Sequence, residues 1–285
     1  MHKMARLMGA HMSTSGGGVP KAIRDGAAIG CGAVQVFTSS PRQWASKMPD
    51  ATLIAETKKA VKETGIEFLV SHDTYLVNLC APADDIREKS IKTLTDELTR
   101  CSQLGIPYVV SHMGSLQGQT FEVGMQRLVA ATAQVLDATP KDVCLAMETT
   151  AGQGSALGYQ FEHWAMVIEA LGGDPRLVIC WDTCHLFAAG YAVHEREGFE
   201  ATVDGFDKLI GLERLRVIHC NDSMKPFGSR LDRHEHIGDG LIGLEPFSWF
   251  VNDARLAHAP LILETNEPEE MHPVNLERLK SMVEA

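Results

Sequence analysis

Eight short runs of apolar residues recur along this chain of 285 residues, separated by longer stretches of mixed polarity. Each run is almost continuously apolar, which is typical of a strand that is buried on both faces in a parallel sheet. The runs cover residues 6–11, 33–37, 67–72, 108–112, 144–149, 177–183, 215–222 and 260–265. The pattern therefore predicts eight parallel strands.

Helical patterns lie between these strands. The clearest cover residues 52–65, 84–105 and 121–136, and the first two end at a glycine that suits a helix C-cap. Eight strands that alternate with helices predict an α/β fold, the (β/α)8 TIM barrel. We expect residues 1–285 to form a single barrel domain, because no linker-like segment divides the chain and such barrels commonly hold about 250 residues.

Side chains that bind metals stand at the carboxyl ends of most predicted strands. Barrel enzymes assemble their active sites at that rim, from several strands at once. One histidine in such a place is usually satisfied by a backbone carbonyl, but the repetition over most of the strands favours a shared site. The residues are His11, His72, His112, Glu148, Asp182 with His185, His219 and Glu264.

The segment LDRHEHIGDG, residues 231–240, adds Asp232 and His234 to the same rim. Read alone, two histidines in a glycine-rich loop are more often solvated than bound to a metal. Imidazole and carboxylate groups are, however, ligands of zinc, and together the rim offers more of them than the four or five that one zinc uses. We therefore expect two or three metals, an arrangement that suits phosphodiester hydrolysis.

Composition and charge bear on the compartment and on the partners. The seven cysteines are scattered and odd in number, which favours reduced thiols, and no signal peptide or long apolar run is present. We expect a cytoplasmic protein with no membrane contact. The formal charge of −11 argues by itself against nucleic acid as a partner, since nonspecific DNA affinity comes mostly from Lys and Arg.

Several longer motifs carry a resemblance to a known family. They are SHDTYLVNL (71–79), METTAGQGSALG (147–158), WDTCHLFAAGY (181–191), HCNDSMKPFGSRLDRHEHIGDGLIG (219–243) and LILET (261–265). Through them the chain resembles endonuclease IV, the family of trinuclear-zinc apurinic/apyrimidinic endonucleases of DNA repair. The resemblance runs from GAHMSTSGG near the N-terminus to LILETN near the C-terminus.

The resemblance implies three zinc ions per chain and a ligand set for each. The implied ligands are His72 and His112 for the first zinc, Glu148 bridging the first and second, Asp182, His219 and Glu264 for the second, and His185, Asp232 and His234 for the third. Within LDRHEHIGDG, His236 and Asp239 match no ligand position. His11 is expected to contact the ligands rather than a metal.

The resemblance also implies the reaction. It is hydrolysis of the phosphodiester 5′ of an abasic site in double-stranded DNA by a zinc-bridged hydroxide, which leaves a 3′ hydroxyl and a 5′ deoxyribose phosphate. Glu148 would be catalytic because it bridges two metals and can orient the nucleophile. Trimming of blocked 3′ ends is expected as well, and we expect a monomer, because the rim must stay open to a bent duplex.

Two segments are expected to contact the DNA. By the resemblance, Arg42, Tyr75 and Leu76 would enter the base stack at the lesion, where the abasic nucleotide is flipped out most cheaply. The conflict with the acidic net charge is resolved if basic residues gather locally on the rim. The candidates for this basic crescent are Arg42, Lys47, Lys225, Arg230 and Arg233.

Two other functions fit parts of the sequence. A sugar isomerase or epimerase with the same barrel would use Glu, Asp and His at strand ends around one divalent metal, but it would not need His185, Asp232 and His234 or the DNA-contacting loops. A noncatalytic protein that binds DNA lesions would keep the fold, but it would be free to lose the ligands, all of which are present.

Overall fold

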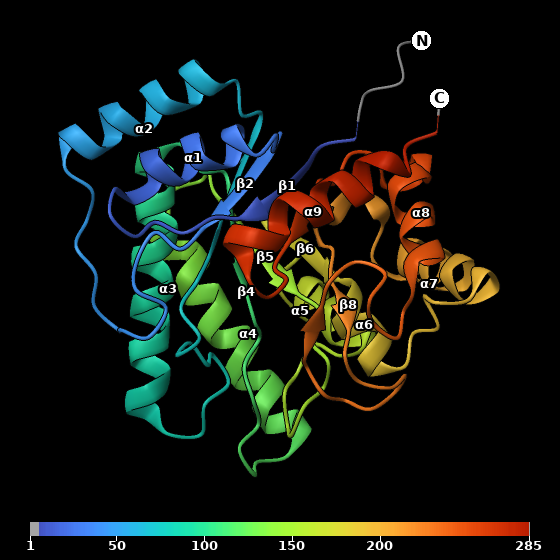
Figure 1. Cartoon of the computed structure of the whole chain (residues 1–285). Coiled ribbons are helices and arrows are strands. Elements are labelled where there is room, and N and C mark those ends of the chain that lie inside the picture. Colours follow the sequence, from blue (N-terminus) through green and yellow to red (C-terminus); the bar gives the residue numbers. More distant parts are fainter. Residues whose placement is uncertain (1–5, 285) are drawn as a thin grey trace.

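The computed structural model describes residues 6–284. Eight parallel strands close into a barrel that helices surround (Figure 1), in the neighbour order β1-β10-β7-β6-β5-β4-β3-β2. The strands are β1 (Met8–His11), β2 (Ala33–Val36), β3 (Phe68–His72), β4 (Tyr108–Ser111), β5 (Cys144–Glu148), β6 (Leu177–Asp182), β7 (Leu215–His219) and β10 (Leu261–Leu263). The predicted (β/α)8 barrel is confirmed.

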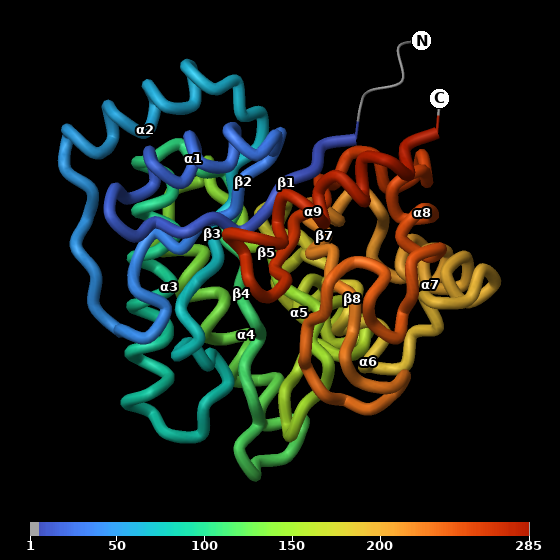
Figure 2. Tube along the Cα trace, viewed as in Figure 1, coloured from blue at the N-terminus to red at the C-terminus, as the bar shows by residue number. Residues whose placement is uncertain are grey.

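The helices connect successive strands on the outside of the barrel. They are α1 (Gly18–Ala28), α2 (Ala51–Thr64), α3 (Asp84–Leu104), α4 (Phe121–Ala138), α5 (Phe161–Ala170), α6 (Thr183–Ala189), α7 (Arg196–Leu209), α8 (Leu244–Asn252), α9 (Pro268–Ser281) and the short 3₁₀ helices Leu212–Arg214 and Ala254–Leu256. Gly65 and Gly105 follow α2 and α3 in the left-handed conformation, as predicted. The last helix, α9, lies beside β1, so the first strand and the last helix of the described residues are neighbours (Figure 2).

The seventh predicted strand is shorter than expected. The pattern predicted a strand over residues 215–222, but β7 ends at His219 and Asp222 begins a separate strand, β8 (Asp222–Ser223). This strand pairs antiparallel with β9 (His234–Glu235), so residues 222–235 form an excursion above the barrel. The prediction was wrong here because Asp222, although buried, holds a loop in place and is not part of the barrel. A pattern of apolar residues does not indicate such a role.

Side chains alternate along each strand between two cores, because successive residues of a strand point to opposite faces. The outward residues pack against the helices, and the inward ones fill the barrel. The inner apolar layer is Ala33, Val70, Val110, Ala146, Val178, Cys180, Val217 and Ile262. This packed layer forms the floor on which the site is built.

Candidate metal centre

A ring of polar side chains lies directly above the inner apolar layer. Seven of its eight members follow a residue of that layer by two positions, and His11 follows Gly9 in the same way, so the alternation of the strand points each of them into the barrel as well. For example, Val70 precedes His72 and Ala146 precedes Glu148. The ring consists of His11, Gln35, His72, His112, Glu148, Asp182, His219 and Glu264, one from each strand of the barrel or from the residue that follows it.

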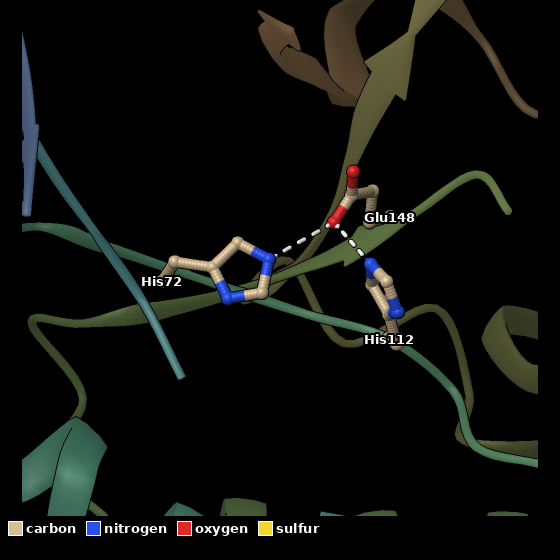
Figure 3. Close-up of side chains that lie close together, drawn as sticks. All are labelled: His72, His112 and Glu148. Carbon is tan, nitrogen blue, oxygen red and sulfur yellow. Dashed lines mark hydrogen bonds and ion pairs between the residues drawn. The ribbon is translucent and has the colours of Figure 1, made fainter. Parts of the chain in front are cut away.

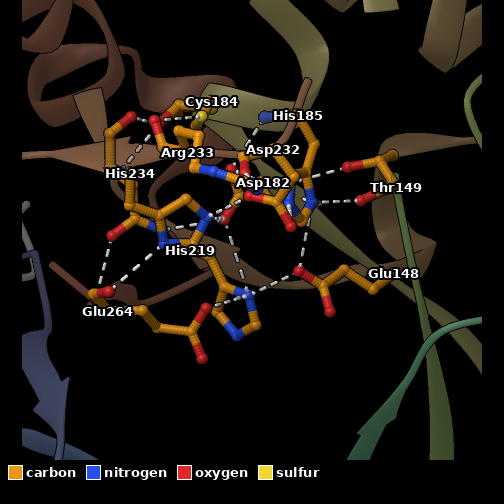
Figure 4. Close-up of polar contacts among 12 residues, drawn as sticks. Glu148, Thr149, Asp182, Cys184, His185, His219, Asp232, Arg233, His234 and Glu264 are labelled. Carbon is orange, nitrogen blue, oxygen red and sulfur yellow. Dashed lines mark hydrogen bonds and ion pairs between the residues drawn. The ribbon is translucent and has the colours of Figure 1, made fainter. Parts of the chain in front are cut away.

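Glu148 is the centre of this ring. Its Oε2 lies 3.2 Å from Nε2 of His72 and 2.9 Å from Nε2 of His112 (Figure 3). Its Oε1 lies 2.9 Å from Nδ1 of His219 and 3.4 Å from Nδ1 of His185 (Figure 4). Burial opposes the ionisation of Glu148, but the imidazoles of His112 and His219 hold its pKa well below its usual range. A buried carboxylate that keeps its charge and faces both sides can bridge two cations.

Among the described residues, four groups of potential ligand atoms share the rim, each with its members within 4.8 Å of one another, and three of them consist only of predicted ligands. These three groups are His72, His112 and Glu148; Glu148, Asp182, His219 and Glu264; and His185, Asp232 and His234. The structure thus brings together all nine predicted ligands, in the three groups that the resemblance implied, with Glu148 common to two of them. Their metal-binding role itself stays a prediction.

The third group comes from a helix and a loop. Asp182 caps α6, because its Oδ1 accepts a hydrogen bond from the backbone N–H of His185 at 2.9 Å, and this cap turns His185 back toward the rim. Asp232 and His234 arrive on the excursion after β8. Burial opposes the ionisation of Asp232, but His185 and His234 keep its pKa well below the ordinary range.

The ring nitrogens face the cluster in a way that suits metal binding. Nδ1 of His72 lies 2.8 Å from the carbonyl oxygen of Asp73, and Nδ1 of His185 lies 2.7 Å from that of Thr149. A carbonyl oxygen only accepts, so these nitrogens carry a hydrogen, and the opposite nitrogen, Nε2, is the one that can bind a cation in place of a proton, as is usual for histidines that bind metals. Nδ1 of His234 makes the same contact with the carbonyl of Glu264 at 3.2 Å.

Two of the inward nitrogens are buried without a hydrogen bond. Among the residues that the structure describes, Nε2 of His185 and Nε2 of His234 have no hydrogen-bond partner. They lie 3.1 and 3.3 Å from the two carboxylate oxygens of Asp232. Buried polar atoms are normally satisfied, so two lone pairs that converge on a carboxylate fit a metal ion.

The carboxylates make the cluster strongly anionic, which raises the affinity of the imidazoles for protons. Burial disfavours the charged ring of His72, but its hydrogen bond with Glu148 and the nearby carboxylates raise its pKa to about 10. Burial opposes the protonation of His185 as well, and the pKa is nevertheless raised well above the usual value by Asp182 and Asp232. A site that attracts protons this strongly also attracts divalent cations, which compete with protons for the same nitrogens.

Cys184 lies near the third group without joining it. Its sulfur is within 4.8 Å of ligand atoms of Asp182 and His234, a grouping that the sequence did not suggest. Burial, with the charge of Asp182, raises the pKa of the thiol to about 12, and the S–H donates to the carbonyl of Arg233. Because metals bind the thiolate, we assign Cys184 a packing role.

The glycines of LDRHEHIGDG let the loop fold back over Asp222. The Asp222 carboxylate accepts hydrogen bonds from the amides of Gly238, Gly240 and Ile242 at 3.0, 3.1 and 2.8 Å. A Cβ on Gly240 would lie 2.5 Å from Oδ1 of Asp222, so only glycine fits there. Asp222 was not among the predicted site residues, although it holds the loop that carries His234.

The remaining polar residues of this loop lie outside the three groups. His236 contacts the side-chain amide of Asn275, and Asp239 pairs with Arg278 at 2.8 Å. His11, in contrast, belongs to the ring, and its Nδ1 lies 3.6 Å from Oε1 of Glu264. None of the three residues belongs to one of the ligand groups of the described chain, and their roles stay predictions.

Two connected cavities open above the ring. One, of about 270 Å³, lies directly over the ligands and is lined by His11, Tyr75, Glu148, Glu264 and neighbours. The other, of about 400 Å³, extends from the ligands between the loops that carry Leu76, Asn78, Gln153 and Arg233. Tyr75 lines both cavities and is 65% exposed.

The predicted DNA-contacting loops lie side by side at this opening. The backbone N–H of Tyr75 donates to the carbonyl of Pro41 at 3.2 Å, and the hydroxyl of Thr74 donates to the same oxygen at 2.7 Å. Arg42, which follows Pro41, is exposed, and Leu76 is half-buried. The two loops therefore form one surface beside the ligands.

The fold and the site define a TIM barrel whose rim carries groups of His, Asp and Glu side chains that could hold metal ions. The family model described as "Xylose isomerase-like TIM barrel" matches residues 23–282. The chain is 47% identical over 278 residues to a probable endonuclease 4 of Chloroflexus aggregans, covering 96% of this chain and 97% of that protein. The chain belongs to the endonuclease 4 family.

The solved structures agree with this assignment. Endonuclease IV from Thermus thermophilus superposes with a TM-score of 0.87 at 34% identity, covering 97% of this chain and 98% of that one. A D-tagatose 3-epimerase-like protein superposes with a TM-score of 0.72 at 15% identity, over 96% of this chain and 97% of that one, and it shares only the fold. The predicted family is confirmed, and the sugar epimerase alternative finds support in the fold alone.

Among the described residues, no helix is long and apolar enough to cross a bilayer.

Proposed function

We propose that this protein is a zinc-dependent DNA repair endonuclease that cleaves the phosphodiester 5′ of abasic sites in duplex DNA. The observation that carries the proposal is the set of three ligand groups joined through Glu148 at the mouth of the barrel, in a chain of the endonuclease 4 family. A further activity of the same site is the trimming of blocked 3′ ends, since such ends present the same phosphodiester chemistry.

We assign three zinc ions to the three groups, with Glu148 shared by the first two. Bound there, zinc would supply a nucleophile near neutral pH and neutralise charge on the phosphate. The mixture of imidazole and carboxylate ligands, without a thiolate, suits zinc and also manganese or iron, so the metal identity is part of the proposal.

The side chains of the ring organise the reaction. Glu148 keeps its charge while buried, so it can orient the attacking water from below the phosphate. Attack on phosphorus breaks the bond to the 3′ oxygen of the preceding nucleotide. The products are a 3′ hydroxyl and a 5′ deoxyribose phosphate. Asp232 and His112 are the most exposed of the nine ligands, with 40% and 38% of their side chains accessible, so the third and the first group both face the incoming strand.

DNA would be held by the surface that Arg42, Tyr75 and Leu76 form. A tyrosine that is 65% exposed beside a cavity can stack on a base, as in other proteins that hold unstacked DNA. Arg42, Lys47, Arg230 and Arg233 are exposed and Lys225 is half-buried, so these charges are available to phosphates despite the acidic net charge. Flipping is cheapest at a nucleotide that has already lost its base, which favours abasic sites as substrates.

Two further parts of the proposal concern the state of the protein. We assign it a monomeric form, because a second copy over the cavities would exclude a bent duplex. We also assign it to the cytoplasm, where the seven free cysteines would remain reduced.

The test is incision of a labelled duplex that contains one tetrahydrofuran abasic analogue, with zinc counted by elemental analysis. Wild type should carry about three zinc ions and cut 5′ of the analogue, and Glu148→Gln should lose the activity. Glu267→Gln is the matched control, because Glu267 lies near the same rim, exposed and outside the three ligand groups. An intact duplex with wild type that is fully loaded with metal would refute the proposal.

A further inference from the structure

The polar ring contains one side chain that cannot ionise. Seven of the eight strands contribute a histidine or a carboxylate, whereas β2 contributes Gln35, which is fully buried. The sequence analysis found nothing charged at the end of this strand and therefore passed over it. Two-residue periodicity would have found Gln35, because Ala33 of the same strand belongs to the inner apolar layer.

Gln35 uses every polar atom of its side chain on the cluster. Its amide nitrogen donates to Oε1 of Glu264 and lies 3.0 Å from Nδ1 of His11. Its amide oxygen lies 2.8 Å from Nε2 of His219. A carboxylate only accepts hydrogen bonds, so the nitrogen of the amide must face Glu264 and the oxygen must face His219.

This orientation determines the tautomer of His219. An amide oxygen only accepts, so Nε2 of His219 carries a hydrogen, and Nδ1 is the ring nitrogen that is left to bind a cation in place of a proton. Nδ1 is the atom that faces the cluster, at 2.9 Å from Glu148 and 3.1 Å from Oε2 of Glu264. The arrangement is the reverse of that in His72, His185 and His234, whose Nδ1 atoms face backbone carbonyls.

We propose that Gln35 is a positioning residue for the second metal, which Glu148, Asp182, His219 and Glu264 would hold. It orients two of these four ligands, His219 and Glu264, with its side chain. The rings of His72, His185 and His234 are oriented instead by backbone carbonyls. Gln35 is fully buried, so it would act on the metal through His219 and Glu264 and not by contact with a substrate. The inference rests on the proposed function, because it requires that this group holds a cation.

The variant that tests the proposal is Gln35→Met, which keeps the length of the side chain and removes its hydrogen bonds. Outer contacts of this kind typically change metal affinity by about 10- to 100-fold. We expect the variant to release one of three zinc ions to a chromophoric chelator at about 10- to 100-fold lower chelator concentration than wild type, and to retain the other two. Val34→Ala is the matched control, because Val34 is the preceding residue of β2 and faces the outer core.

A purely structural role for Gln35 would give a different result. Both variants would then unfold at lower temperature, and neither would change zinc release. Equal release of all three ions by wild type and Gln35→Met would therefore overturn the inference while leaving the proposed function intact. A wild type that binds no zinc at this site would overturn both.

A second measurement uses the wild-type protein and needs no folded variant. Long-range proton–nitrogen NMR spectra of the zinc-loaded protein distinguish the two histidine tautomers. We expect His219 to carry its hydrogen on Nε2 and His72, His185 and His234 to carry theirs on Nδ1. A hydrogen on Nδ1 of His219 would contradict the role assigned to Gln35.

Discussion

A buried ion pair on α3 supports the loop that carries Arg42. Glu97 and Arg100 are each 3% exposed and pair with each other. Oε1 of Glu97 accepts hydrogen bonds of 2.6 Å from the hydroxyls of Thr38 and Ser71, the residues next to the Arg42 loop and to His72. Nε of Arg100 donates to the carbonyl of Lys47, at the far end of the same loop.

Arg100→Met would leave the charge of Glu97 buried with no cation beside it, and with only the hydroxyls of Thr38 and Ser71 and the thiol of Cys101 as donors. Removing one partner of a buried pair typically costs about 3–5 kcal/mol, whereas replacing both charges costs much less. The double variant Glu97→Gln with Arg100→Met keeps an acceptor for Thr38 and Ser71 and buries no charge. We therefore expect a loss of about 3–5 kcal/mol in the single variant and of about 1–2 kcal/mol in the double one, the scale of ordinary lost hydrogen bonds.

The assay is cooperative unfolding in urea, with Lys92→Met as the control on the same helix. Lys92 pairs with Asp96 at the surface, with 75% of its side chain exposed, so its loss should change stability by less than about 0.5 kcal/mol. A single variant Arg100→Met that is as stable as this control, or a double variant that is less stable than the single one, would refute the reasoning.

Three other predictions concern DNA binding and pH. Tyr75→Ala should weaken binding of a duplex with an abasic analogue by about 10-fold in a titration, because stacking on an aromatic ring is worth about 1–3 kcal/mol; unchanged affinity, with Tyr75→Phe as the control, would exclude stacking. Binding should weaken steeply as salt increases, because it depends on phosphate contacts, and a flat response would exclude the basic crescent. Burial lowers the pKa of His272 to about 4, so the unfolded chain, in which histidine titrates near 6.5, binds the proton more readily. Stability should therefore fall by about 3 kcal/mol as the pH drops from 6.5 to 4, and a His272→Leu variant that loses the same amount in that window would disprove the assignment.

The strands and most of the polar ring could be predicted from the sequence because both follow from local patterns of residues. A run that is apolar on both faces identifies a parallel strand, and the charged residue at its end, such as His72 or Glu148, then falls on the rim. Gln35 escaped notice because an amide carries no charge to mark it. The role of Asp222 and the pairing of β8 with β9 were not predicted either. Both depend on contacts between residues more than ten positions apart, which no local pattern indicates.

The assignment of the ligands to three groups could be made only from the resemblance. The distances and orientations of the ligands could be seen only in the structure. Spacing along the chain does not indicate that Glu148 faces four imidazoles, or that His219 presents Nδ1 where His72 presents Nε2. These choices follow from which backbone or side-chain acceptor lies behind each ring. They depend on contacts between strands that are far apart in sequence.

Native mass spectrometry of the zinc-loaded protein tests most directly whether nine side chains hold three cations on one rim. We expect a monomer with three zinc ions for wild type and with two for Asp232→Asn, because Asp232 belongs only to the third group. A wild-type mass with a single metal, unchanged by Asp232→Asn, would contradict a three-metal site and would favour the one-metal site of a sugar isomerase.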